Sequence, residues 1–193
     1  MALAPAIDDG ARRNQSVFRA VMTAMAHPAR IERVGDRDAN CPLPDCMGDL
    51  AHALCDFETP VWLDSALDRA NVADWLRFHT GAPLVRNPAL AAFAFVSDPM
   101  AVPTLESVAL GSDAYPDRST TVVMVVEVLS NASGVTVIGP GIQGAAQLEI
   151  GRARSGLWDE RTALQPLFPR GVDFIFVCGD SIAAIPRSAM IEV

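Results

Sequence analysis

Two mostly apolar runs near the end of the chain restrict the fold more than any other feature. They occupy residues 172–177 and 182–185, and a four-residue turn at 178–181 separates them. Within that turn, Gly179-Asp180 between two apolar runs is a good signal for a two-residue β-hairpin. The chain is therefore predicted to contain a sheet with at least one antiparallel pair of strands.

Further strands are predicted wherever an apolar or β-branched run is bounded by turn residues. These runs lie at residues 31–34, 61–63, 91–96, 121–129 and 134–138. Residues 131–134 between the last two runs are interpreted as a turn that joins them as a second hairpin.

Helical periodicity predicts four helices, at residues 15–26, 47–57, 67–78 and 157–164. In the first helix, Asn14 is expected to cap the start and Pro28 to prevent continuation. Helices alternate with strands early in the chain, whereas hairpins dominate late. This order predicts an α/β fold with a mixed sheet covered by helices. The 193 residues contain no repeat or linker, so we expect a single domain over 1–193.

The charged residues exclude several classes of function. A net charge of −8 argues against a general nucleic-acid binder, which needs a basic face. All 15 basic residues are arginine, so the chain cannot form a Schiff base with pyridoxal phosphate (PLP) or supply a P-loop lysine. We therefore expect no PLP cofactor. Arginine still binds phosphate well, because its planar guanidinium group can donate hydrogen bonds to two oxygens at once.

The hydropathy pattern predicts a cytoplasmic protein without a membrane partner. Residues 122–128 form the longest apolar candidate, and Glu127 interrupts it. The first ten residues lack a basic segment followed by an apolar core, so no secretory signal is expected. Structural disulfides are rare in the reducing cytoplasm.

Cys46, His52 and Cys55 form the one cluster worth testing as metal ligands. On a helix over 47–57, Phe57 is expected to lie in a buried apolar stripe. His52 points away from this stripe, and Cys46 lies far around the helix from His52. Only His52 and Cys55 are neighbours, and two ligands do not make a zinc site. No metal is therefore expected.

Two short motifs resemble functional signatures and are better explained as turns. Gly139, Gly141 and Gly144 match the dinucleotide pattern G-x-G-x-x-G, but residues 145–150 give no amphipathic helix to hold a pyrophosphate. A glycine-rich turn is predicted, and whether it contacts a ligand stays open. Gly179-Asp180-Ser181 resembles the start of an esterase motif, but no histidine base follows it.

His79 ends an apolar stripe in the third predicted helix, after Val72, Trp75 and Leu76. In one interpretation, His79 is partly buried and either bonds to a backbone carbonyl or caps the end of the helix. In the other, it faces a ligand beside the loop that follows the helix. Arg77 points away from this stripe and is interpreted as a surface charge or a partner contact.

Arg170 and Arg187 flank the C-terminal hairpin, and each follows a proline that limits the local backbone. Anion binding by these two arginines is one interpretation. Solvated or ion-paired side chains are the other.

Several blocks of the sequence resemble one known family. They are FRAVM at 18–22, MAHP at 25–28, DFETPVW at 56–62, LRFHTGAP at 76–83, FPRGVD at 168–173 and AIPR at 184–187. The family is PhnH, the H subunit of the bacterial carbon–phosphorus lyase system. The resemblance spans nearly the whole chain, with the blocks in the same order, and LRFHTGAP is the most distinctive of them.

The resemblance implies a fold like the large domain of PLP-dependent transferases, without the cofactor. It also implies a homodimer when isolated and a core complex with the G, I and J subunits. In that system, ATP and an alkylphosphonate give a ribose 1-phosphonate 5-triphosphate, with ATP a substrate of the complex.

No catalytic set carries over from the resemblance. The candidate residues for holding a phosphate or phosphonate, or for contacting a partner subunit, are the polar residues in matching blocks: Arg77, His79, Thr80, Arg170 and Arg187. The acidic net charge favours a structural or assembly role. An enzyme active by itself and a stand-alone phosphate- or nucleotide-binding module remain alternatives.

Overall fold

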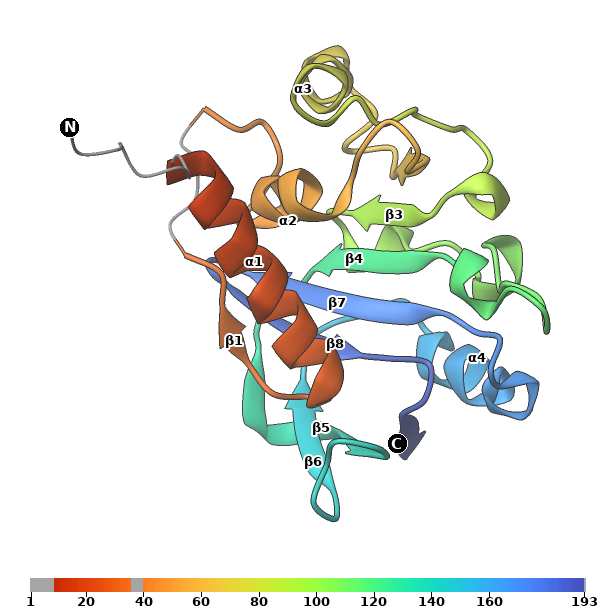
Figure 1. Cartoon of the computed structure of the whole chain (residues 1–193). Helices are drawn as coiled ribbons and strands as arrows, with labels where there is room; N and C mark the ends of the chain where they lie inside the picture. Colours follow the sequence, from red (N-terminus) through yellow and green to blue (C-terminus); the bar gives the residue numbers. More distant parts are fainter. Residues whose placement is uncertain (1–8, 36–39, 193) are drawn as a thin grey trace.

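The fold has three layers built around a six-stranded sheet (Figure 1). The computed structural model describes residues 9–35 and 40–192, so the segment that bears on a secretory signal lies mostly outside the described residues. Helices cover one face of the sheet. A shorter helix, 3-10 turns and a small second sheet cover the other.

The central sheet is mixed, as predicted. Its strands, in spatial order, are β1 (Glu32–Arg33), β8 (Ser181–Ile185), β7 (Asp173–Cys178), β4 (Thr121–Val125), β3 (Phe93–Val96) and β2 (Val61–Leu63). Strands β2, β3, β4 and β7 are parallel, whereas β8 is antiparallel to both of its neighbours. Cys178 pairs with Ser181 across the Gly179-Asp180 turn, which confirms the predicted hairpin.

Both faces of this sheet are buried, and this explains why its strands are almost continuously apolar. Alternate residues of a strand point to opposite faces. On β7, Ile175 packs toward the helices, whereas Phe174 and Phe176 stack on each other in the opposite core.

Three helices, α1 (Asp9–Ala26), α2 (Met47–Leu54) and α3 (Ala70–Thr80), pack on one face. The fourth, α4 (Leu157–Ala163), packs on the other, where it was predicted in the sequence. Helix α1 begins before residue 15, so Asn14 lies inside the helix and does not cap it. Helix α2 ends at Leu54, so Phe57 lies beyond the helix and is exposed, in contrast to the predicted buried stripe.

The second sheet is antiparallel, with the order β6 (Ala146–Glu149), β5 (Ser130–Ile138), β9 (Met190–Glu192). The predicted hairpin at 131–134 is wrong, because these residues lie inside β5. Strand β4 already pairs with β3 on one side and β7 on the other, so no edge is left for β5. The chain leaves the main sheet after Val125 and forms a new one.

Among the described residues, five 3-10 turns complete the fold, at Pro88–Leu90, Pro99–Ala101, Leu105–Ser107, Pro116–Arg118 and Gln165–Leu167. Within the described ranges, no helix has the length and apolar character required to cross a bilayer.

A buried carboxylate joins the ends of β2 and β3 to the segment that leads into α3. Asp64 has no exposed surface, and it follows directly after β2. Its Oδ1 accepts hydrogen bonds from the N–H groups of Ala66 and Leu67, at 3.1 and 2.8 Å. Its Oδ2 accepts from the N–H groups of Ser97 and Asp98, at 2.7 and 3.1 Å. One side chain thus satisfies four backbone donors in the segments that follow β2 and β3.

Replacing Asp64 with alanine is expected to lower the free energy of unfolding by about 3 kcal/mol or more, because several buried donors lose their acceptor. Urea denaturation followed by circular dichroism measures this loss. Asp117→Ala, on an exposed turn, is the matched control and should change stability by less than about 0.5 kcal/mol. Equal stability of the two variants would contradict the role assigned to Asp64.

Candidate functional site around helix α3

Helix α3 ends in a cap that reverses the chain. Gly81 has φ +73°, a left-handed conformation that favours glycine, and its N–H donates to the carbonyl of Arg77 at 3.1 Å. The Thr80 hydroxyl donates to the Leu76 carbonyl at 2.7 Å and accepts from the Ala82 N–H at 3.1 Å. Thr80, a predicted site residue, therefore holds the end of the helix.

His79 lies on the side of α3 that faces α2. Its ring centroid is 4.5 Å from that of Trp75 and 5.1 Å from that of His52. The rings of His52 and Trp75 meet edge to face, also at 5.1 Å. His79 is exposed and continues this ring cluster to the surface. The helical spacing correctly placed His79 beside Trp75, whereas the contact with His52 depends on the packing of two helices.

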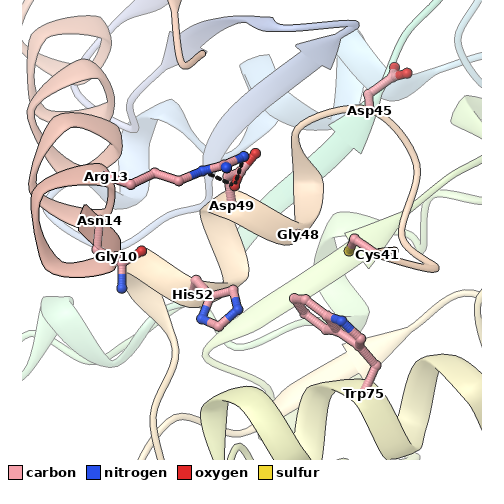
Figure 2. A pocket seen from close by; sticks show the side chains of 9 residues that line it. All are labelled: Gly10, Arg13, Asn14, Cys41, Asp45, Gly48, Asp49, His52 and Trp75. Atoms are coloured by element: carbon pink, nitrogen blue, oxygen red, sulfur yellow. Dashed lines mark hydrogen bonds and ion pairs between the residues drawn. The ribbon is translucent and has the colours of Figure 1, made fainter. Parts of the chain in front are cut away.

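Beside the ring cluster is a small pocket between α1, α2 and α3 (Figure 2). Arg13 reaches from α1 to Asp49 of α2, with an ion pair of 2.8 Å, while His52 and Trp75 lie toward each other from α2 and α3. The cavity measures about 160 Å³. It has room for several water molecules or one small ion but not for a nucleotide.

No sequence pattern indicated Arg13 or Asp49, because only the packing of α1 against α2 brings them together. Gly48 is required in this wall, since a Cβ atom there would collide with Sγ of Cys41.

Cys46 and Cys55, on either side of helix α2, are not activated nucleophiles. Burial raises the pKa of Cys46 and of Cys55 to about 12, so both thiols are protonated at neutral pH. All four cysteines lie in the described ranges, and none forms a disulfide. Over residues 9–35 and 40–192, no three His, Cys, Asp or Glu side chains are grouped so that they could hold a metal ion.

Arg77 projects from the other side of α3. Its only ion pair with a described residue joins it to Asp74 at 3.5 Å, and both side chains are mostly exposed. There it lines a second hollow, of about 460 Å³, together with Trp62, Asp68 and Arg86. His79 and Arg77 thus project from different sides of α3. Arg86 was not among the predicted site residues.

Arg170 and Arg187 lie elsewhere, at the start of β7. Arg187 binds both carboxylate oxygens of Asp173 and the carbonyl of Pro116. Arg170 pairs with Asp113 at 3.1 Å. Strands β4 and β3 separate β7 from β2, which lies next to α3, so the five predicted residues do not form one site. The ion-paired interpretation describes both arginines.

The glycine-rich segment at 139–144 is a turn between β5 and β6, as predicted, and no helix follows it. Gly141 has φ +84°, and a Cβ atom there would collide with the carbonyl of Ala26 at the end of α1. Close packing against α1 therefore explains this glycine.

Comparison with known proteins gives the family. A family model described as "Bacterial phosphonate metabolism protein (PhnH)" matches residues 5–192. The chain belongs to the PhnH family. A protein of Rhizobium meliloti (strain 1021), named alpha-D-ribose 1-methylphosphonate 5-triphosphate synthase subunit PhnH, is 36% identical over 179 residues, which is 92% of this chain and 90% of that protein.

A second relative comes from Stutzerimonas stutzeri and is named putative C-P lyase subunit protein HtxG. It is 29% identical over 183 residues, which is 95% of this chain and 88% of that protein. Both comparisons extend over almost the whole chain.

Replacing Thr80 with valine should lower the free energy of unfolding by about 1–2 kcal/mol, because the Ala82 N–H loses its acceptor. Thr80→Ser keeps the hydroxyl and should stay within about 0.5 kcal/mol of the native chain. The midpoints of urea denaturation measure both effects. A valine variant as stable as the native chain would show that the hydroxyl does not hold the helix end.

Proposed function

We propose that this chain is a subunit of the carbon–phosphorus lyase core complex. In this proposal it supports formation of alpha-D-ribose 1-methylphosphonate 5-triphosphate from ATP and methylphosphonate. Family membership supports the proposal, as do the two relatives, whose names designate subunits of such an assembly. The chain would contribute to a transferase complex without complete activity by itself.

The structural observation that carries the proposal is a pair of exposed aromatic side chains at the end of α3. Phe78 is 85% exposed and Phe57 is 74% exposed. Phe57 lies next to the cap of α3. If Gly81 carried a Cβ atom, that atom would lie 3.6 Å from the Cβ atom of Phe57. Exposed phenylalanines lose contact with water when a partner covers them, and aromatic side chains often dominate the energy of an interface. We assign this end of α3 to a partner subunit.

The finer parts of the proposal concern assembly and architecture. The partners would be the G, I and J subunits, and the isolated chain would form a homodimer in the cytoplasm. The single domain would resemble the large domain of PLP-dependent transferases. The absence of lysine agrees with a chain that does not bind PLP through a Schiff base. ATP would be a substrate of the complex.

A stand-alone phosphate- or nucleotide-binding module is the second candidate, and the hollow lined by Arg77 and Arg86 favours it. The two candidates differ in one respect. A subunit needs its partners for turnover, whereas a binding module holds its ligand without them.

Co-expression with the G, I and J subunits, with affinity capture of this chain, tests the subunit role. We expect the native chain to form a stoichiometric complex. The dissociation constant of this complex should rise at least about tenfold in the variants Phe57→Ser and Phe78→Ser, since each variant loses a large apolar contact. Phe18→Ser, on the exposed side of α1, is the matched control and should assemble normally.

Two outcomes would contradict the proposal. The first is a chain that remains alone when all three partners are present. The second is turnover of ATP and methylphosphonate by the purified chain alone that is lost in His79→Ala, which would make this protein an enzyme by itself.

A further inference from the structure

The hollow on the Arg77 side of α3 is built by two segments that the Gly81 cap brings together. After the cap, the chain returns along the edge of β2. The Val61 N–H donates to Pro83 at 2.8 Å, and the Val85 N–H donates to Val61 at 2.9 Å. These bonds bring Arg86 to the hollow of about 460 Å³ that Arg77 also lines. Cavities of about 300–1,000 Å³ are typical of small-molecule sites.

The charge at this hollow contrasts with that of the whole chain. The net charge is −8, yet two guanidinium groups line one cavity. Arg86 forms no ion pair with any described residue, and Arg77 has only the exposed contact with Asp74 at 3.5 Å. By comparison, Arg187 is fully engaged by Asp173 and Pro116. The guanidinium groups of Arg77 and Arg86 are therefore available to an added anion.

The other walls define the rest of a ligand. Leu63, Leu84 and Val85 supply apolar surface. Trp62 also lines the hollow, but its side chain packs against the core on the other face of the sheet. Asp68, the one acidic residue in the lining, can accept a hydrogen bond from a hydroxyl group. The hollow also lies where β2 ends at Leu63, and ligands of open α/β sheets bind outside the carboxyl ends of parallel strands.

We propose that this hollow binds an organic phosphate or phosphonate, with the anionic group between Arg77 and Arg86. The apolar and hydroxyl-bearing part of the ligand lies against Leu84, Val85 and Asp68. Two forked arginines can share the oxygens of one phosphate or of neighbouring phosphates. The site deepens the proposed function by giving the chain a ligand of its own, but the binding of an anion here does not depend on assembly with partners.

Isothermal titration of the full, isolated chain tests the site, with ATP, AMP, adenosine and inorganic phosphate as probes. ATP and AMP should bind more tightly than either adenosine or phosphate, because only the nucleotides use both parts of the hollow. Arg77→Gln and Arg86→Gln should each raise the Kd for ATP about tenfold or more, since each removes a charge-assisted hydrogen bond. Arg152→Gln, an exposed arginine on the loop before α4, is the matched control and should bind as the native chain does.

Three results would overturn the site. One is no heat of binding with any probe at millimolar concentration. Another is an ATP affinity that is equal in all three variants, which would put the nucleotide elsewhere. The third is a pair of findings: the native chain does not bind ATP, and the Arg86→Gln variant does not assemble with partner subunits. Together they would make the hollow a protein contact. Binding of ATP by a chain that captures no partner would leave the site intact and refute the subunit role.

Discussion

The Asp64 carboxylate is the interaction on which the arrangement around α3 depends. It holds the ends of β2 and β3 together and accepts the N–H groups of Ala66 and Leu67 just before α3. A buried carboxylate is stable only when donors surround it, and here backbone groups supply them. Because two of these donors follow β2 and the other two follow β3, the relative positions of the two segments are fixed together. Helix α3 therefore starts from a rigid base.

The direction of each side chain on α3 follows from helix geometry. Residues two positions apart point about 200° away from each other, so Arg77 and His79 necessarily face different sides. His79 joins the ring cluster with Trp75 and His52, whereas Arg77 reaches the hollow that Arg86 also lines. Thr80 bonds back to the helix itself. Between these sides, Phe78 is exposed at the helix end, where a partner could cover it.

Local signals predicted the local parts of this structure. The β7–β8 hairpin depends on a two-residue turn and two apolar runs, and both are visible in the sequence. The mixed sheet and α4 followed from the same kind of pattern. The hairpin predicted at 131–134 failed because pairing in a sheet depends on which edges other strands have already taken. Phe57 was placed in a buried stripe because the end of α2 at Leu54 carries no glycine or proline signal.

The candidate site was only partly predictable for a related reason. His79 and Arg77 were found because they belong to one helix and one distinctive block. Arg86 lines the same hollow as Arg77 only because of the reversal at Gly81 and the pairing of residues 83–85 with β2, which no spacing rule predicts. Arg170 and Arg187 are arginines like Arg77, but they form ion pairs with Asp113 and Asp173, respectively. Residue type and proline context alone do not distinguish an ion-paired arginine from an available one.

Amide hydrogen exchange, compared between the isolated chain and the assembled complex, is the most direct measurement of where partners bind. Exchange should slow over residues 76–86, at the end of α3 and the segment that returns along β2. It should stay unchanged on the outer side of α1, around Phe18 and Met22, which are also exposed. Slower exchange on α1 with none over 76–86 would contradict the placement of the partner surface at the end of α3.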